Sequence, residues 1–359
     1  MSICQIVLLS MTIISVVALY KSITRRQIVE KLTINGNFKD PWMPLHIDAV
    51  NGLTHHMFGY ESFKDPLLQP TKYLVVPSPD CRRVRFLVIV FTAPDDFESR
   101  DRWRRIYGGQ RMRHKFGYCV IFPIGRLQDE HENSRLNEEI PIGRLQDEHE
   151  NSRLNEEINF FDDILQGDYV ESYRNVTLKS LSALRFIAVA YPRVELIMKI
   201  DDDVAWNVPK VSNYISRALP RSISCYKFEA RSPVRKTRSK WYVSHDEYPH
   251  GKFPQHCSGI AYMLDREALL PMLNAVPKLD HFWIDDVFIT GFLTRDADIS
   301  FVEINRYIEL EPLRRKFPDK VFYDDMMFYG TSKENIGRQF VARTWYVTLL
   351  IDKSIIYAP

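Results

Sequence analysis

Continuous apolar runs along the chain predict strands that are buried on both faces of a sheet. The first run covers residues 84–92 (VRFLVIVFT), and two more cover residues 118–122 and 194–200. β-branched and aromatic residues dominate such runs in the strands of parallel sheets. Helical patterns cover residues 96–107 and 178–190, between the runs. Strands that alternate with helices predict an α/β fold with a mostly parallel central sheet and flanking helices.

The amino-terminal segment is apolar enough to cross a membrane. Residues 3–20 carry no charge, and nothing basic precedes them, which favours a signal anchor over a cleaved signal peptide. Lys21, Arg25 and Arg26 follow this span, and the positive-inside rule alone would place them in the cytosol. The sequence therefore predicts a transmembrane helix within residues 1–20, whose orientation these charges do not establish.

The rest of the chain divides into a linker, one large domain and a tail. Residues 21–80 hold scattered Pro, Gly and aromatic residues without a sustained period, which is typical of a stem. The domain is expected over residues 81–345, and the tail over residues 346–359.

An identical tandem repeat interrupts the domain, because residues 123–140 occur again as residues 141–158. Eighteen residues make about five helical turns, so the second copy could keep the helical phase. Pro141 and Gly143 interrupt the helix preference, which favours a looped-out segment over one long helix. The acidic and His residues of the repeat are expected to form a solvated face rather than a metal site.

Composition gives no reason to expect a nucleic-acid partner. The 359 residues are 45% hydrophobic and 26% charged, as in a globular protein, and 48 Lys and Arg against 46 Asp and Glu leave a net charge of +2. The spacings of Cys81, Cys119, Cys225 and Cys257 match no zinc pattern. Some of them can pair in an oxidising compartment, but Cys119 lies in an apolar run and is expected to be a buried free thiol.

Three consecutive acids at the end of a predicted strand give the sharpest chemical signal. Lys199 and Ile200 are followed by Asp201, Asp202 and Asp203, at the strand end where α/β sheets bind ligands. In extended geometry Asp201 and Asp203 point to one side and could share a divalent cation with a diphosphate, while Asp202 faces elsewhere. Carboxylate oxygens favour Mn²⁺ or Mg²⁺ over zinc.

A second acidic pair, Asp285 and Asp286, stands between Trp283 and an apolar run that begins at Val287. Partial desolvation there would raise the proton affinity of one acid, as a general base requires, whereas the other reading is a helix N-cap. Gly259, in the segment HCSGIAY, would let backbone approach a ligand or simply form a tight turn.

Six motifs in this order resemble the β1,3-galactosyltransferase and β1,3-N-acetylglucosaminyltransferase family of Golgi enzymes. They are RDRWR, FFDDILQGDYVESYRNVTLKSL, KIDDDV, SPVRKTRSKWYVS, FPQHCSGIAY and DDVFITG, and the similarity covers roughly residues 84–300. The resemblance implies a GT-A fold that binds a nucleotide-sugar, with Mn²⁺ held against UDP by the D-x-D acids. It also implies an inverting transfer and a type II Golgi membrane protein, with residues 81–345 as a lumenal catalytic domain.

On the donor side, the resemblance places Asp201 and Asp203 at the D-x-D positions, with Asp203 the preferred metal ligand. Asp202 belongs to the same donor-side group. Lys199 would serve the phosphates or form a salt bridge. Arg100 and Arg104 match an arginine-rich motif whose role is nucleotide binding or packing under the donor.

On the acceptor side, Asp286 matches the acid of the family's E/D-D-V motif and would be the base, with Asp285 the second choice. Trp241 would stack on a sugar or fill the core, and Gly259 and Tyr262 are assigned to the sugar side. A separate expectation is a glycan on Asn175, in the only N-x-S/T sequon of the chain.

The predicted reaction moves galactose, or as second choice N-acetylglucosamine, from its UDP derivative to the 3-hydroxyl of a glycan on protein or lipid. One departure from the family concerns its late metal-binding histidine, because no histidine follows His281. The competing hypothesis is a catalytically silent lumenal protein that binds glycans or assists the folding of a related transferase. A two-carboxylate glycosidase fits poorly, because the acid cluster follows a strand and no isolated acid partner is evident.

Overall fold

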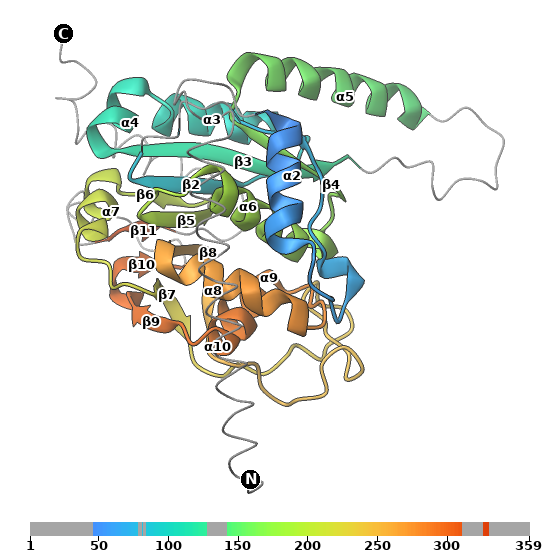
Figure 1. The fold of residues 1–359 in the computed structure, drawn as a ribbon, viewed down its shortest axis with the longest axis vertical. Coiled ribbons are helices and arrows are strands. Elements are labelled where there is room, and N and C mark those ends of the chain that lie inside the picture. Colours follow the sequence, from blue (N-terminus) through green and yellow to red (C-terminus); the bar gives the residue numbers. More distant parts are fainter. Residues whose placement is uncertain (1–45, 78–80, 82–83, 128–141, 311–325, 330–359) are drawn as a thin grey trace, which may run out of the picture. The chain divides into compact units, whose positions relative to one another are not determined.

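The computed structural model describes residues 46–77, 81, 84–127, 142–310 and 326–329 (Figure 1). The predicted anchor over residues 1–20 and the predicted tail over residues 346–359 lie outside this part of the chain. Among the described helices, none is long and apolar enough to cross a membrane.

A mixed eight-stranded sheet forms the centre of the domain. In sheet order its strands are β1 (Tyr73–Val75), β4 (Ile164–Val170), β3 (Tyr118–Arg126), β2 (Phe86–Phe91), β5 (Leu196–Asp201), β8 (His256–Asp265), β7 (Ser222–Phe228) and β9 (Ser300–Glu303). Neighbours from β4 to β5 are parallel, whereas β8 is antiparallel to both β5 and β7. The prediction of an α/β fold is confirmed, and the sheet is mixed, with four of its seven strand pairings parallel and three antiparallel.

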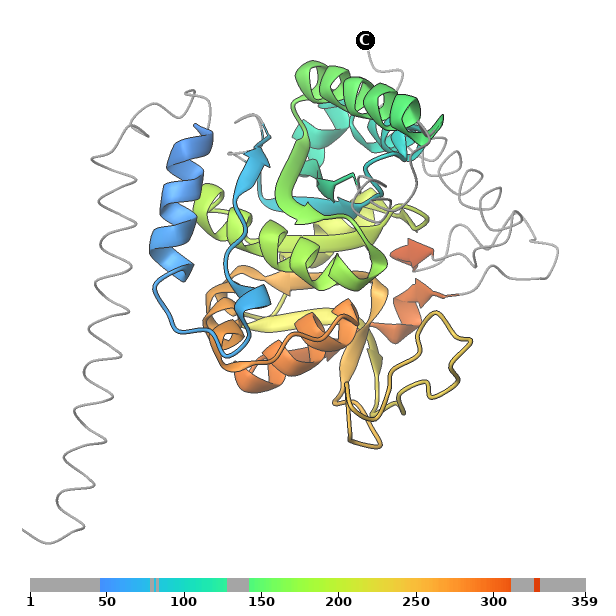
Figure 2. The same cartoon turned by 90° about the vertical axis from the view of Figure 1, so that its right-hand side faces the viewer.

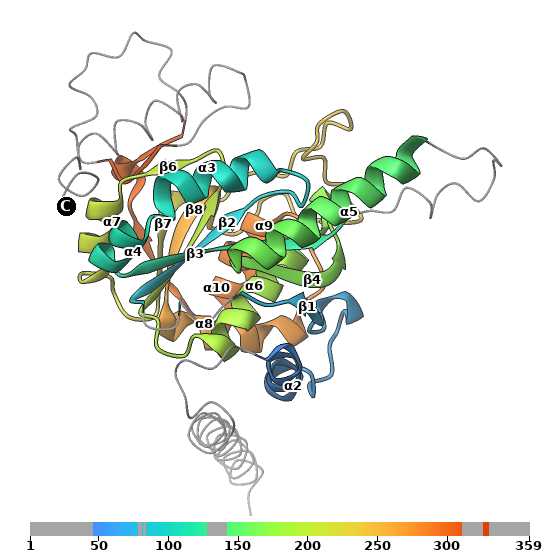
Figure 3. The same cartoon turned by 90° about the horizontal axis from the view of Figure 1, so that it is seen from above.

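Helices cover both faces of the sheet (Figures 1 and 3). α3, α4 and α5 lie along one face, and α6, α8 and α10 lie on the other. The helices are α2 (Ile47–Phe58), α3 (Phe97–Tyr107), α4 (Gln110–Phe116), α5 (Ile142–Phe161), α6 (Val176–Ala190), α7 (Val208–Ile215), α8 (Arg266–Ala275), α9 (Asp285–Val287) and α10 (Leu293–Asp296).

The apolar side chains of β2 pack against the helices on both faces of the sheet, because successive side chains of a strand point to opposite faces. Phe86, Val88 and Val90 join the core beneath α3, which also contains Trp103 and Trp206. The residues between them, Leu87 and Ile89, are equally buried and therefore face the α6 side.

Two features of the sheet position the candidate site. In β2 and β5, Phe91 lies opposite Asp201, so both parallel strands end at the same edge. In β5 and β8, Lys199 lies opposite Tyr262, which brings the HCSGIAY segment beside the acidic turn. Directly after that turn, β6 (Ala205–Trp206) joins a small sheet in the order β10 (Ile308–Glu309), β11 (Phe328–Tyr329) and β6.

The folded domain begins earlier than the pattern of residues 21–80 predicts. α2 contacts α6 and β1, and β1 pairs antiparallel with β4 (Figure 2). Asn51 of α2 connects this helix to β1, since its side chain forms hydrogen bonds with both the amide and the carbonyl of Tyr73. Residues from 46 onward therefore belong to the domain, because buried side chains of α2 anchor an otherwise patternless segment.

The tandem repeat takes two different structures. The first four residues of the first copy, 123–126, are the end of β3. The second copy forms α5, which begins at Ile142 and continues through Gly143. The prediction that this copy loops out is therefore wrong for α5, although residues 128–141 lie outside the described part. The loss of backbone entropy at one glycine is a cost of about 1 kcal/mol, which a long helix tolerates.

The carboxyl-terminal half of α5 is docked on the domain rather than wholly solvated. Leu154 is 3% exposed and joins the core beneath α3. Glu157 is 8% exposed and accepts hydrogen bonds from Arg100 at 2.6 and 2.9 Å and from Arg104 at 2.5 Å. Arg104 also binds Asp163, with both distances 2.8 Å. The expectation of a solvated acidic face is thus wrong for Glu157, whose charge holds α5 to α3.

Replacing Glu157 by Gln should destabilise the domain by about 3 kcal/mol, because it leaves a buried guanidinium without its counter-charge. Burial alone would raise the pKa of Glu157, but Arg100 and Arg104 lower it below its usual value. A lowered pKa stabilises the fold above the unfolded pKa, and this contribution is lost as pH falls through the folded pKa. Thermal unfolding at pH 7 measures the loss. Glu156→Gln, an exposed neighbour on α5, is the matched control, and equal midpoints for both variants would contradict the role of Glu157.

Two disulfides connect the four cysteines that follow the amino-terminal segment. Cys81 pairs with Cys119, and Cys225 pairs with Cys257. The expectation that Cys119 is a free thiol is wrong, because its partner comes from the segment just before β2. The second disulfide joins β7 to β8 next to the candidate site.

Candidate functional site

The acidic turn follows β5 at the carboxyl edge of the parallel strands. β5 ends at Asp201, and the amide of Val204 donates to the carbonyl of Asp201 at 3.2 Å, which closes a turn over the three acids. The three acids therefore form a turn, whereas the sequence analysis expected extended geometry. The expectation that Asp202 faces away from the other two acids still holds. Its neighbours are Ser99 and Asp96 at the start of α3.

Lys199 is the buried cation beneath this turn. Its ammonium group donates to Asp201 Oδ1 at 2.5 Å and to the carbonyl of Gly259, and its residue is 3% exposed. Of the two roles predicted for Lys199, this geometry matches the salt bridge. The ammonium group fixes Asp201 against β8.

The remaining carboxyl groups of the turn hold protons more tightly than free aspartate does. Burial, followed by the negative charges of Asp201 and Asp202, raises the pKa of Asp203 to about 7. Burial also raises the pKa of Asp202 to about 6. Crowded carboxylates of this kind are a liability until a cation neutralises them.

A divalent cation fits the chemistry of this turn. The described residues contain no group of three or more His, Cys, Asp or Glu placed to hold a metal by themselves. Asp201 and Asp203 would supply two hard oxygen donors, and a bound diphosphate and water would supply the others. This division suits an ion that arrives with its substrate.

The second acidic pair lies on α9, directly before a π-helical turn over Phe288–Phe292. Burial raises the pKa of Asp285 to about 7, against the opposing charge of Lys199, and Asp285 Oδ1 is buried without a hydrogen-bond partner. Burial also raises the pKa of Asp286, while His256 acts in the opposite direction. Asp286 Oδ1 accepts from the amide of Val287 at 2.9 Å. Asp286 is the more exposed of the two acids, so it is the better placed to meet a substrate.

Gly259 lies against Asp286. A Cβ atom at position 259 would stand 3.4 Å from the Cβ atom of Asp286 and 3.5 Å from its Oδ2. The approach that this glycine permits is thus to the candidate base itself. Tyr262, which the sequence assigned to the sugar side, is 1% exposed. Burial and then the charges of Asp285, Asp201 and Asp286 raise the pKa of Tyr262, so its buried phenol lies close to these acids and not on an open sugar-binding surface.

Aromatic and basic side chains form an exposed rim beside these acids. Trp241 and Tyr173 are each 49% exposed, so Trp241 does not fill the core. The ammonium group of Lys240 lies 4.3 Å from the ring of Trp241 and 5.7 Å from that of Tyr173. Trp283 is only 6% exposed and supports the rim from within, with its ring centroid 5.7 Å from that of Tyr173. Such rings suit the apolar faces of a sugar.

Arg100 and Arg104 lie behind the end of β2 and not at an open surface. Arg100 is fully buried and donates to the carbonyls of Ala93 and Pro94, as well as to Glu157. This position matches the packing role and corrects the assignment of Arg100 to nucleotide contact. Its bonds shape the loop that leaves β2 at the edge of the sheet where the acidic turn lies.

The sequon residues have structural partners in the folded domain. Asn175 Nδ2 donates to the carbonyl of Val170 at 2.8 Å, and Thr177 Oγ1 donates to the carbonyl of Phe282 at 2.7 Å. A glycosylated asparagine keeps one N–H, so the bond to Val170 is compatible with a glycan. Glycosylation of Asn175 stays a prediction.

Several residues at the site were not predicted from the sequence. Tyr173 stands inside the motif ESYRN, whose resemblance to relatives marked the segment but not that residue. His256 and Thr290 stand in quoted motifs as well, and only their contacts reveal a role. In the sequence, Trp283 is visible only as an apolar neighbour of the second acidic pair.

Comparison with known proteins agrees with this geometry. The galactosyltransferase family model matches residues 128–305. Beta-1,3-galactosyltransferase 5 of Homo sapiens is 25% identical over 260 residues, which cover 69% of this chain and 76% of the relative. Lactosylceramide 1,3-N-acetyl-beta-D-glucosaminyltransferase A of Xenopus laevis is 27% identical over 214 residues, covering 57% of this chain. The matched part spans about half of that relative, 53%.

Solved structures show distant likenesses. A glycosyltransferase involved in the glycosylation of the major capsid of PBCV-1 has a TM-score of 0.35 at 12% identity and covers 74% of this chain and 98% of its own. The galactosyltransferase LgtC has a TM-score of 0.35 at 6% identity, with coverages of 73% and 95%. From the family model and the sequence relatives, the chain belongs to the galactosyltransferase family and is a hexosyltransferase.

Proposed function

We propose that the protein is an inverting β1,3-glycosyltransferase that moves galactose from UDP-galactose to the 3-hydroxyl of an acceptor glycan. The observation that carries this proposal is the arrangement around Lys199, where Asp201 of the acidic turn and both acids of α9 lie close enough to act on the same buried ammonium group. One acid group thus faces the donor edge of the sheet, and the other stands beside an aromatic rim. UDP-N-acetylglucosamine is the second donor candidate.

In this mechanism Asp286 holds the proton that the acceptor gives up. The acceptor oxygen bonds to the anomeric carbon from the face opposite UDP, the bond between that carbon and the UDP oxygen breaks, and the proton moves to the carboxylate of Asp286. One displacement converts an α-linked donor into a β product. Mn²⁺, or Mg²⁺ in its place, would be held by Asp201 and Asp203 and would neutralise charge on the departing diphosphate.

The exposed rim supports a glycan acceptor, carried by a protein or a lipid. Tyr173 lies close enough to Asp286 for that charge to act on its phenol, Trp241 is its hydrogen-bond partner, and Lys240 lies over both rings. A GT-A type of α/β fold agrees with the carboxyl-edge position of the acidic turn. We further propose a type II Golgi membrane protein with the domain in the lumen, and the two disulfides are compatible with such an oxidising compartment.

The direct test is release of UDP from a panel of UDP-sugars in the presence and absence of β-linked acceptor glycans. Acceptor-dependent release from UDP-galactose, with a new β1,3 bond in the product, is the expected result. Acceptor binding without release from any donor would instead support the silent glycan-binding homologue.

Trp241→Ala should raise the KM for the acceptor about 10-fold, which corresponds to about 1.4 kcal/mol of lost contact. The KM for the donor should not change, because Trp241 belongs to the rim and not to the acidic turn. Initial rates at varied acceptor and donor concentrations separate the two constants. Tyr60→Ala removes an aromatic ring that is 72% exposed on the domain and serves as the control. An unchanged acceptor KM in the Trp241 variant would remove the rim from the proposal.

A further inference from the structure

The position of Asp286 depends on an unusual piece of backbone. Asp286 belongs to α9, a helical segment of three residues that passes directly into the π-helical turn over Phe288–Phe292. Isolated π-helical turns weaken the regular hydrogen-bond pattern and occur frequently at functional sites. Another group must therefore fix the backbone that carries the carboxylate.

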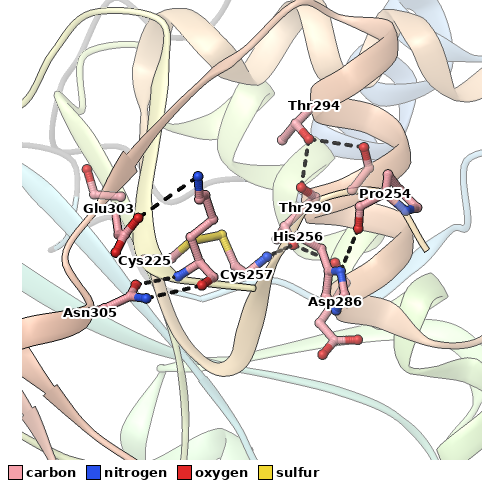
Figure 4. The surroundings of a disulfide bond; sticks show 12 residues. Cys225, Pro254, His256, Cys257, Asp286, Thr290, Thr294, Glu303 and Asn305 are labelled. Atoms are coloured by element: carbon pink, nitrogen blue, oxygen red, sulfur yellow. Dashed lines mark hydrogen bonds and ion pairs between the residues drawn. A yellow bond between two sulfur atoms is a disulfide. The ribbon is translucent and has the colours of Figure 1, made fainter. Parts of the chain in front are cut away.

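The Thr290 hydroxyl supplies that fixed point (Figure 4). Thr290 Oγ1 donates to the carbonyl of Asp286 at 2.5 Å and accepts from the amide of Cys257 at 2.8 Å. A hydroxyl has one proton and two lone pairs, so these two bonds use it as a bridge between α9 and β8. Thr290 is fully buried, and water does not compete for either bond.

The β8 side of this bridge is firmly held. Cys257 is joined to Cys225 of β7 by a disulfide, and β7 and β8 are paired strands. Gly259 lies two residues farther along β8, on the same side of the strand, and it is the residue that lies against Asp286. β8 thus meets Asp286 at two points, through the Thr290 hydroxyl and through the bare backbone of Gly259.

Thr294, one turn farther along the chain, is a buried threonine with which Thr290 can be compared. Thr294 Oγ1 donates to the carbonyls of Thr290 and Gly291 at 2.6 and 3.1 Å, and its residue is 1% exposed. Both of these bonds stay within the same helical segment. The two threonines therefore share residue type, burial and a bond to the preceding turn, but Thr290 alone of the pair bonds the amide of Cys257.

We propose that Thr290 is a positioning residue for the base Asp286, because its hydroxyl ties the Asp286 backbone to β8 and thereby sets where the carboxylate meets the acceptor. This inference rests on the proposed function. Misplacing a reacting group by about 1 Å can cost about 100-fold in rate, so a partial loss of position should appear in kcat.

The test compares Thr290→Val, Thr290→Ser and Thr294→Val in the full chain. Thr290→Val should lower kcat about 10-fold with both KM values unchanged, whereas Thr290→Ser, which keeps the hydroxyl, should retain most of kcat. Thr294→Val should also stay near the wild type. Equal losses in the two valine variants would overturn the proposal, since they would reflect the helix in general, and so would an unchanged kcat in Thr290→Val.

Hydrogen exchange gives a second readout that does not depend on catalysis. The amide of Cys257 should exchange faster in Thr290→Val than in Thr294→Val, and equal protection would contradict the bridge. Thr290→Ala leaves space for water and replaces Thr290→Val in both measurements if the valine variant does not fold. Full activity of an Asp286→Asn variant would refute the proposed function itself, whereas a normal Thr290→Val beside an inactive Asp286→Asn refutes only the positioning role.

Discussion

Asp286→Asn should lower kcat by about 10² to 10⁴, because the amide cannot take the proton that the acceptor hydroxyl loses. The substitution keeps the size of the side chain and keeps an oxygen that can accept from the amide of Val287. The donor KM should therefore change little. Steady-state transfer to a glycan acceptor, with thermal unfolding measured in parallel, is the experiment.

The matched control is Asp285→Asn, on the neighbouring residue. Asp285 is buried and its Oδ1 has no hydrogen-bond partner, so loss of its charge should stabilise the domain or leave it unchanged. The sequence ranks Asp286 first and Asp285 second as the base. A larger loss of kcat in Asp285→Asn than in Asp286→Asn would reverse this ranking.

The pH profile gives a second view of Asp286. Burial raises the pKa of Asp286, and a base works only when it is deprotonated, so kcat should rise with pH through that raised pKa and then level off. In Asp286→Asn this rising limb should disappear from the residual rate. A limb that survives unchanged would belong to another group.

Asp203→Asn should abolish metal-dependent transfer, which we expect as a loss of at least about 100-fold, on the scale found when one charge-stabilising group is removed. The affinity for Mn²⁺ should fall as well, and direct titration with Mn²⁺ measures it without reference to turnover. Asp298→Asn, at an exposed acid outside the site, is the control. Full activity of the wild type in the presence of a chelator would count against the metal.

Asp203→Asn should not reduce the thermal stability of the domain, although it should reduce activity. An acid whose folded pKa is raised to about 7 opposes folding once pH exceeds its unfolded pKa of about 3.9, because the charged form is disfavoured in the native turn. Without metal at pH 8, Asp203→Asn should therefore unfold at the same temperature as the wild type or a higher one. Inactivity combined with undiminished stability would separate a lost ligand from a lost fold.

The parallel half of the sheet could be predicted from the sequence because it is buried on both faces. The runs over 84–92, 118–122 and 194–200 became β2, β3 and β5, and continuous apolar stretches have few other uses in a chain of this kind. β4 escaped notice because its sequence, ILQGDYV, mixes polar and apolar residues. β8 did too, since its first residues, HCSG, give no strand pattern although they form the wall of the site.

The acids of the site were found from local signals, but their surroundings were not. A carboxylate turn after a buried strand is visible in the sequence, whereas the buried bond between Arg100 and Glu157 joins residues 57 positions apart. Cys119 shows the same limit, because an apolar neighbourhood favours a free thiol and only the folded chain brings Cys81 to it. Partners at long sequence separation leave no periodic trace.

The duplicated segment has a consequence for how such an insertion survives. The first copy contributes its opening residues to β3, and the second contributes its closing residues, with Leu154 and Glu157, to the docked half of α5. Because the copies are identical, removing any 18 consecutive residues that begin between 123 and 141 leaves the same chain of 359 − 18 = 341 residues. In that shorter chain, a single copy would supply both the end of β3 and the docked half of α5. The duplication thus lengthened the connection between a strand and a helix while preserving every residue that either of them buries, and selection against it would act only on the added connection.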